Sequence, residues 1–201
     1  MAKAELNREA WLTELAKRIV PDIEARVDVT MPAYRIAMGF PSRNALSRYR
    51  RVIGQCWKHT VSLDGVHELF ISPMIHDPVE VAGTVVHELL HAGVGVEHGH
   101  KKPFAQAARK MLLEGKPTAT IAGRDFADAI DPILRKLPPY PHSGMVVDPT
   151  YKAPAGRMLK VECPVCSFKA RITRAWLENE EYGAPICPKH KKVMVEAEAQ
   201  H

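Results

Sequence analysis

The apolar positions of the first 20 residues recur at the spacing of an amphipathic helix. Leu12, Leu15 and Ile19 lie three or four residues apart, and side chains at that spacing share one face of a helix. Proline lacks the N–H group that the interior of a helix requires. The pattern therefore predicts a helix over residues 4–19 that ends before Pro21.

Short runs of β-branched and aromatic residues follow, each bounded by turn-forming residues. They cover residues 25–30, 34–40, 51–57 and 66–73, and runs of this length and composition are typical of strands. The Asp64-Gly65 pair before the last run predicts a hairpin turn. We therefore expect a small antiparallel sheet.

The periodicity becomes helical again at residue 77. Asp77 is a suitable N-cap, Pro78 fits the first helical position, and Glu80 stands where a capping-box partner is expected. The helix should end near Gly93 or Gly95, because glycine readily adopts the left-handed conformation that follows a helix.

Two more helices are predicted over residues 103–114, with Gly115 as the C-terminal cap, and over residues 127–137. Residues 137–158 contain five prolines, which is typical of a linker or of an extended wrapping segment. We therefore expect a domain over residues 1–136, a proline-rich linker over 137–158 and a separate small unit over 159–196.

Composition adds few constraints. The chain has 201 residues, of which 46% are hydrophobic and 25% charged, as in soluble globular proteins. No apolar run approaches the length of about 20 residues that crosses a bilayer, and residues 1–18 mix charges without the apolar core of a signal peptide. We expect a cytoplasmic protein with no membrane partner. The net charge of +5 permits contact with nucleic acid but does not require it.

The main candidate for chemistry is the motif H-E-L-L-H at residues 87–91. Two histidines four residues apart project from one helix face and can reach one ion, most often zinc. Such an ion lowers the pKa of water towards about 7, and Glu88 is placed to accept the proton and pass it to a leaving amine. The alternative is that His87 and His91 are histidines at the edge of the core. The helix-start signal and the additional histidines after the motif favour the metal site.

A catalytic zinc needs three protein ligands and an open position. The candidates for the third ligand are His98, His100, Glu97 and Glu114. His98 and His100 flank one glycine, so their side chains point apart in an extended or turning segment and we expect one of them to bind. Glu97 is expected at the surface, and Glu114 at a helix end where it caps or is solvated. The spacing leaves the choice between His98 and His100 open.

The segment VVHELLHAGVGVEHGHKKPF, residues 85–104, resembles the SprT-like zinc metallopeptidase family, which is Spartan-related. The segments IGQCW and LFISPMIHDPVEV resemble the strand and helix start that precede the motif in phage-borne and bacterial members. The resemblance covers most of residues 30–115. It implies that His100, four residues before Phe104, is the third ligand, with His98 as the alternative. It also implies a zincin-like α+β domain that acts on proteins, including DNA-associated proteins, in the host cytoplasm if the chain is phage-encoded.

The C-terminal unit carries a second set of candidate ligands: Cys163, Cys166, Cys187 and His190. Two short C-P-x-C/H turns that each follow an apolar run are what a zinc ribbon requires, because each turn brings two side chains towards one tetrahedral ion. SprT-like proteins often carry such a ribbon with four cysteines, and here His190 takes the fourth place. The alternative is a pair of free thiols with an unrelated Cys187.

These observations predict an α+β zinc metallopeptidase with Glu88 as the general base, one catalytic zinc and one structural zinc. The alternatives are a nucleic-acid-binding or regulatory adaptor in which both metals are structural, and a metal amidohydrolase that acts on a small molecule. Trp176 could stack on a base, although a place in the small core is the simpler expectation. DNA is a candidate partner because of the resemblance and of the basic residues of the ribbon: Lys160, Lys169, Arg171, Arg174, Lys189, Lys191 and Lys192.

Overall fold

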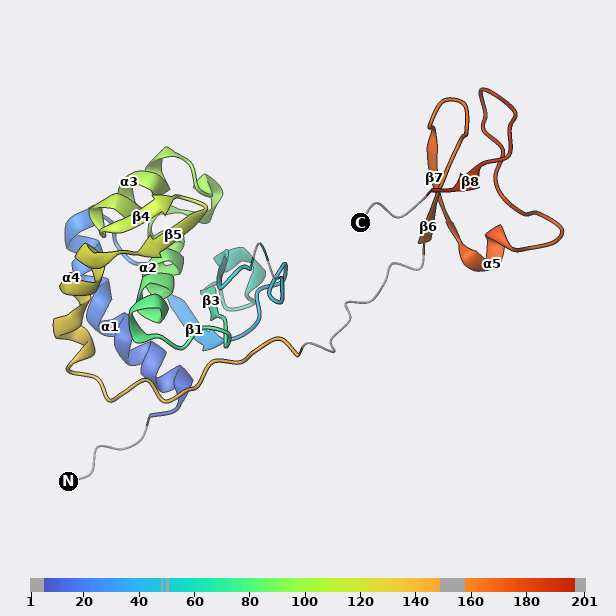
Figure 1. The fold of residues 1–201 in the computed structure, drawn as a ribbon. Helices are drawn as coiled ribbons and strands as arrows, with labels where there is room; N and C mark the ends of the chain where they lie inside the picture. The colour runs from blue at the N-terminus through green and yellow to red at the C-terminus, as the bar shows by residue number, and fades with distance from the viewer. Residues whose placement is uncertain (1–5, 48, 50, 149–157, 198–201) are drawn as a thin grey trace. The chain divides into compact units, whose positions relative to one another are not determined.

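The structure is a computed structural model that describes residues 6–47, 49, 51–148 and 158–197. The chain divides into two compact units, Met1–Val147 and Asp148–His201, and each is considered by itself (Figure 1). The fold is mixed α+β, with five α-helices and three small sheets in the described part of the chain. Among the described residues, no helix has the length and apolarity needed to cross a membrane.

The first helix, α1, spans Arg8–Val27 and begins at Asn7, whose side chain accepts a hydrogen bond from the N–H of Ala10 at 2.8 Å. The prediction that it ends before Pro21 is wrong, because the helix continues through this proline. The apolar face continues at Ile23, which is fully buried. The free energy gained by burying Ile23 offsets the cost of the hydrogen bond that proline cannot make. The strand predicted over residues 25–30 is therefore absent, and its first residues lie in α1.

The main sheet contains β1 (Tyr34–Met38), β2 (Gly54–Trp57) and β3 (His67–Ile71) in the order β1-β3-β2. β2 and β3 are antiparallel, but β1 and β3 are parallel. The expectation of an antiparallel sheet is thus wrong, because alternation along a strand specifies its faces and not the direction of its partner. Asp64-Gly65 is not a two-residue hairpin turn either: residues 58–66 form a longer loop that includes a 3-10 turn, η1, at His59–Val61.

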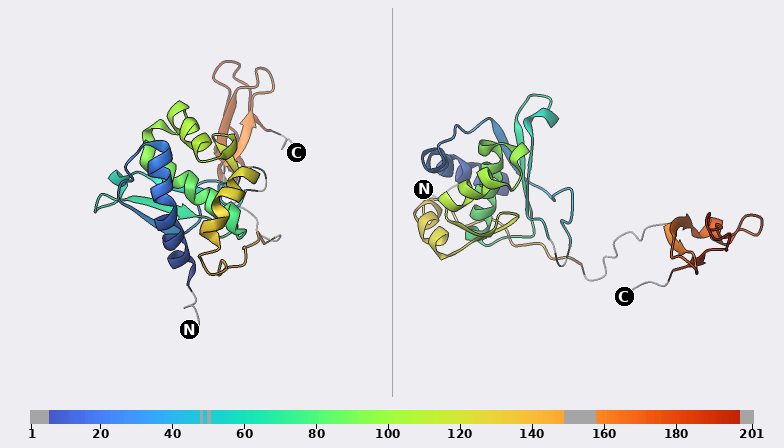
Figure 2. Two further views of the ribbon diagram at one scale, coloured as in Figure 1. Left: turned by 90° about the vertical axis from the view of Figure 1, so that its left-hand side faces the viewer. Right: turned by 90° about the horizontal axis from the view of Figure 1, so that it is seen from above.

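The predicted helix at residue 78 is confirmed as α2, Pro78–Val94. The side chain of Asp77 accepts hydrogen bonds from the N–H groups of Val79 and Glu80 at 3.0 and 2.9 Å, and Gly95 follows the helix with a φ of 109°. α2 contacts α1, β2 and β3, and also α3 (Lys102–Lys110), α4 (Arg124–Leu134) and β5 (Ala119–Ala122). Figures 1 and 2 show α2 in the interior of the unit. Most of its side chains are buried, so the helix that carries the histidine motif is held from several sides.

The segment after α2 differs most from the prediction. Helix α3 spans Lys102–Lys110 and ends at Met111, because Leu112 adopts a left-handed φ of 62°. Gly115 is therefore not a helix cap but part of a hairpin formed by β4 (Leu113–Lys116) and β5 (Ala119–Ala122). Helix α4, Arg124–Leu134, confirms the helix predicted over residues 127–137 and begins three residues earlier than expected.

Residues 138–147 form an extended wrapping segment on the first unit, which is one of the two expected alternatives. The indole N–H of Trp11 donates to the carbonyl of Pro138 at 2.9 Å, and the Trp11 and Tyr140 rings meet edge to face at 4.8 Å. The N–H of Met145 donates to the carbonyl of Pro73 at 2.9 Å. The linker predicted over residues 137–158 thus begins inside this unit, and residues 149–157 lie outside the described residues.

The second unit contains β6 (Met158–Glu162), β7 (Lys169–Thr173), the short helix α5 (Arg174–Leu177) and β8 (Val195–Glu196). The three strands form an antiparallel sheet in the order β7-β6-β8. Trp176 is 54% exposed, so the expectation that it forms the small core is wrong. The buried residues of this unit's core are instead Val161, Cys163, Cys187 and Met194.

Candidate metal centres

Three histidines from two parts of the first unit converge on one point. His87 and His91 lie one turn apart on α2, and His100 lies in the loop just before α3. The Nε2 atom of His100 is 3.2 Å from the Nε2 atoms of both His87 and His91. The structure therefore brings together three of the residues that the sequence singled out.

The spacing of these nitrogens fits a shared metal ion. Two imidazole nitrogens bound to one tetrahedral zinc at about 2.0–2.1 Å lie about 3.3–3.4 Å apart. The two distances of 3.2 Å are close to this value. One hydrogen on the Nε2 of His100 can serve only one of the two contacts, so the lone pairs in this group are better satisfied by a cation.

The surroundings keep the three imidazoles neutral, as metal ligands must be. Burial, together with the nearby His91 and His100, lowers the pKa of His87 to about 3. Burial and the neighbouring His100 lower the pKa of His91 to about 4. Burial also lowers the pKa of His100. At neutral pH all three rings therefore offer a lone pair.

The other candidates for the third ligand do not join this group in the described structure. His98 ends the 3-10 turn η2, Val96–His98, and Gly99 follows it with a positive φ of 49°. This backbone reversal separates His98 from His100. Glu97 and Glu114 are both exposed, Glu97 in η2 and Glu114 in strand β4.

Phe104 forms an apolar floor beneath the three imidazoles. Its side chain is buried, and its ring centre lies 4.7, 4.2 and 5.1 Å from the ring centres of His87, His91 and His100. The contact with His91 is a stacked one with an interplanar angle of 21°. Phe104 thus restricts the orientation of the rings and excludes water from one side of the site.

Glu88 is buried beside this group and is held by the backbone of β2. The carboxylate accepts a hydrogen bond from the N–H of Cys56, and burial outweighs that bond and raises the pKa of Glu88 to about 8. A cation among the histidines would lower this pKa again, because opposite charge favours the ionised form. A Cβ placed on Gly54 would lie 2.3 Å from Oε1 of Glu88, so the strand approaches the carboxylate too closely for a side chain.

The sequence analysis does not assign Gly54, Cys56 and Thr120 to the site. A usable signal exists for Gly54 alone, since a glycine inside a strand-like run can mark the close approach of another group. Thr120 in β5 carries none, because the pattern predicts the end of a helix in place of the β4–β5 hairpin. Its Oγ1 lies 2.7 Å from Nδ1 of His87.

An open cavity of about 700 Å³ lies over the histidines and Glu88. Part of its lining comes from residues 51–56, which include most of β2, and another part comes from residues 118–122, which include β5. Both strands lie at the edges of their sheets. Asp77 and Glu80 add acidic groups and Arg51 a basic one to a lining that also contains apolar residues of both strands.

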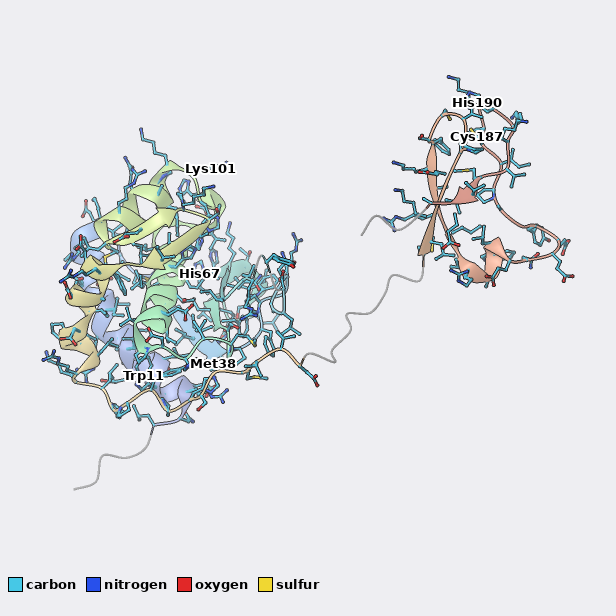
Figure 3. The ribbon with its side chains drawn as sticks, in the orientation of Figure 1. Trp11, Met38, His67, Lys101, Cys187 and His190 are labelled. Atoms are coloured by element: carbon cyan, nitrogen blue, oxygen red, sulfur yellow. The ribbon has the colours of Figure 1, made fainter. Side chains whose placement is uncertain are left out.

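The four candidate ligands of the second unit also converge. The Sγ atoms of Cys166 and Cys187 are 3.8 Å apart, and Nδ1 of His190 is 3.9 Å from Sγ of Cys163 and 3.8 Å from Sγ of Cys187. Sulfur atoms bound to one tetrahedral zinc at about 2.3 Å lie about 3.8 Å apart. Figure 3 shows Cys187 and His190 at the same end of the unit.

The two ligand turns share one backbone pattern. The N–H of Ser167 donates to the carbonyl of Cys163 at 3.0 Å, and the N–H of Lys191 donates to the carbonyl of Cys187 at 2.9 Å. Ser167 and Lys191 have matching positive φ values of 53° and 54°. Burial raises the pKa of the Cys163 thiol, but hydrogen bonds from the backbone N–H groups of Cys166 and Val165 and from the side chains of Cys187 and His190 outweigh it and bring the pKa down to about 6. This favours the thiolate that binds metal.

No protein-family model, curated protein or solved structure matches this chain. The fold and the sites nevertheless define a class: a mixed α+β chain with two candidate metal sites, one of three histidines and one of three cysteines and a histidine. Both donor sets are consistent with zinc.

Proposed function

We propose that this chain is a zinc-dependent metallopeptidase of the SprT-like, zincin type that hydrolyses peptide bonds of protein substrates. The observation that carries the proposal is the convergence of three neutral imidazoles beside a buried carboxylate, within an open cavity of about 700 Å³. A closed structural site needs four protein ligands, whereas three ligands and an open side are typical of a catalytic zinc.

In this proposal His87, His91 and His100 hold the ion. A zinc ion in such a site polarises a carbonyl oxygen and lowers the pKa of water. Glu88 takes up the proton of the attacking water and passes it to the leaving amine. Burial raises the pKa of Glu88 to about 8 before any cation binds, and the charge of a bound ion would lower it, which favours the ionised carboxylate that a general base requires.

The shape of the cavity supports a protein substrate over a small molecule. The cavity is open, and its walls include the edge strands β2 and β5. The unpaired side of an edge strand offers backbone N–H and carbonyl groups to an extended peptide. A peptide lying between the two strands would place its backbone over Glu88 and the histidines, whereas a site for a small molecule is usually more enclosed.

The second metal site has a structural role in this proposal. Among the described residues of the second unit, the core contains four buried ones, two of which are the candidate ligands Cys163 and Cys187. A unit with so little apolar burial depends on its metal for much of its folding free energy. We propose zinc here because a set of three thiolates and one imidazole is typical of closed zinc sites.

A second candidate function is binding of nucleic acid by the ribbon, and the exposed aromatic residues favour it. Trp176 and Tyr182 are 54% and 65% exposed, with their ring centres 5.5 Å apart. Exposed aromatic rings provide stacking surfaces for unpaired bases, although Glu178, Glu180 and Glu181 lie between these two rings in the chain and weaken the attraction to phosphate. The two functions are compatible if the substrates are proteins bound to DNA, and they are alternatives if the chain binds DNA without cleaving protein.

The test is the Glu88→Gln variant, which removes the base but keeps a side chain of the same size beside the ligands. We expect unchanged zinc content and loss of cleavage of a denatured protein, assayed with and without single- and double-stranded DNA. The matched control is Glu97→Gln, which changes an exposed glutamate near the site and should leave cleavage unchanged. Unchanged cleavage by Glu88→Gln would refute the general base, and tight DNA binding by a wild-type chain that cleaves nothing would favour the adaptor.

A further inference from the structure

We propose that Thr120 is a positioning residue for the metal ligand His87, and that the β4–β5 hairpin thereby forms part of the metal site. This inference rests on the proposed binding of zinc by His87, His91 and His100. The observation is the distance of 2.7 Å between Oγ1 of Thr120 and Nδ1 of His87. Thr120 lies in β5, 33 residues after His87 in the chain.

The direction of this hydrogen bond follows from the geometry of the ligands. Nε2 of His87 points at Nε2 of His100, at 3.2 Å, so Nε2 is the nitrogen that would bind the metal. A neutral imidazole with a free lone pair on Nε2 carries its hydrogen on Nδ1. His87 therefore donates this hydrogen to the Thr120 hydroxyl oxygen. A hydrogen bond of this kind fixes both the tautomer and the ring orientation of a metal ligand.

The hairpin is held in register with α2 by a second contact. A Cβ placed on Gly83 would lie 2.9 Å from Cβ of Ala122, so the helix and β5 approach closely at that point. Gly83 and His87 are four residues apart on one face of α2, a rise of about 6.0 Å. Thr120 and Ala122 are two residues apart on one face of β5, a rise of about 6.6 Å. Gly83 thus faces Ala122 while His87 faces Thr120.

The other two ligands are oriented by different means. His91 stacks on Phe104 at 4.2 Å, and His100 meets the same ring edge to face at 5.1 Å. His87 contacts the edge of this ring at 4.7 Å with an interplanar angle of 61°, which leaves rotation of its own ring to be fixed by Thr120. Loss of the threonine hydroxyl should therefore weaken the site through His87.

The experiment measures zinc affinity of the full chain by competition with a chromophoric chelator. Thr120→Val removes the hydroxyl but keeps the shape, Thr120→Ser keeps the hydroxyl, and Thr118→Val makes the same change two residues away in the same cavity wall. We expect Thr120→Val to bind one zinc about 10–100-fold more weakly, and Thr120→Ser and Thr118→Val to match the wild type. The ribbon zinc is an internal reference that should not change.

A second readout separates positioning from general loss of structure. With cobalt in place of zinc, the visible absorption of the three-histidine site should change in Thr120→Val and not in Thr118→Val, while circular dichroism shows both variants folded. Equal affinity and equal spectra in the two valine variants would overturn the inference, as would an equal loss in Thr120→Ser and Thr120→Val. Gly83→Ala, which pushes the hairpin from α2, should weaken the same zinc even if Thr120→Val folds poorly.

The outcomes also distinguish this inference from the proposed function. If Thr120→Val weakens zinc binding but Glu88→Gln cleaves as well as the wild type, the positioning role stands and the peptidase mechanism fails. If Glu88→Gln is inactive but Thr120→Val binds zinc normally, the mechanism stands and the role of Thr120 fails. If His100→Ala loses no zinc, the shared metal site and the role of Thr120 are both refuted.

Discussion

Replacement of Gly54 by alanine tests whether the position of the Glu88 carboxylate controls the proposed reaction. The new Cβ would lie 2.3 Å from Oε1 of Glu88, 2.8 Å from Cγ2 of Thr84 and 2.9 Å from Cδ of Glu88. Ordinary contacts begin near 3.4 Å. Because Glu88 is buried and bound to the N–H of Cys56, the carboxylate must move by about 1 Å or the strand must shift.

Two magnitudes follow from this displacement. A misplacement of about 1 Å at a reacting group can reduce the rate about 100-fold, so we expect kcat/KM to fall by about two orders of magnitude. The free energy of unfolding should fall by about 1–3 kcal/mol, the usual cost of an extra methyl group in a packed site. Zinc content should not change, since none of His87, His91 and His100 is among the nearest atoms.

The assay compares cleavage of a denatured protein, zinc content and urea unfolding in Gly54→Ala and Gly39→Ala. Gly39 is the matched control: a Cβ there would lie 2.7 Å from the Phe70 ring, so it should lower stability to a similar extent without touching Glu88. We expect both variants to bind zinc and only Gly54→Ala to lose activity. Full activity in Gly54→Ala, or an equal loss in Gly39→Ala, would refute the reasoning.

Three further predictions concern the ligands and the helix. His100→Ala should lose one equivalent of zinc per chain and His98→Ala none, as measured by atomic emission; the reverse result would exchange their roles. Cys187→Ser should lose the zinc equivalent of the ribbon and unfold only the second unit. NMR spectra of this variant should lack the folded signals of the second unit and keep those of the first; an intact ribbon would contradict a structural metal. Pro21→Ala should raise the free energy of unfolding by up to about 3 kcal/mol in urea titrations, because alanine restores the hydrogen bond to the carbonyl of Lys17; a decrease would show that the proline ring itself is needed.

The features that can be predicted from the sequence depend on neighbouring residues. The start of α2 follows from Asp77 and Pro78, and its end from Gly95, all of which act within one helical turn. The pairing of His87 with His91 likewise follows from the helical repeat alone. Local sequence therefore predicts these elements and contacts with nearly their observed bounds.

The features that local sequence does not predict depend on contacts between distant segments. α1 continues past Pro21 because Ile23 is buried in the core of the unit, and local propensity does not report this burial. The turn at Leu112 needs a left-handed φ in a residue that rarely adopts one, so the pattern predicts a helix end in place of the hairpin. The parallel pairing of β1 with β3 is also set by the path of the chain between them.

The candidate site shows the same division. From the sequence alone, the choice of His100 over His98 depends on the family resemblance. In the structure, the choice depends on the backbone at Gly99, whose φ is 49°, and the local sequence does not specify that conformation. Cys56 and Thr120 reach the site from two strands that belong to different sheets and line the same cavity, and nothing in their local sequence marks them. Long-range supports of this kind can be found only once the strands are placed.

If the chain is a peptidase as proposed, the arrangement of these supports couples substrate binding to the reaction. β2 contacts Glu88 through the N–H of Cys56, β5 contacts His87 through Thr120, and the same two strands line the cavity. In the proposed peptidase, a peptide that pairs with either strand edge would therefore press on the backbone that positions the proposed base or a proposed ligand. Substitutions in these walls that displace the backbone should change kcat, and not only KM, because they move reacting groups as well as the binding surface.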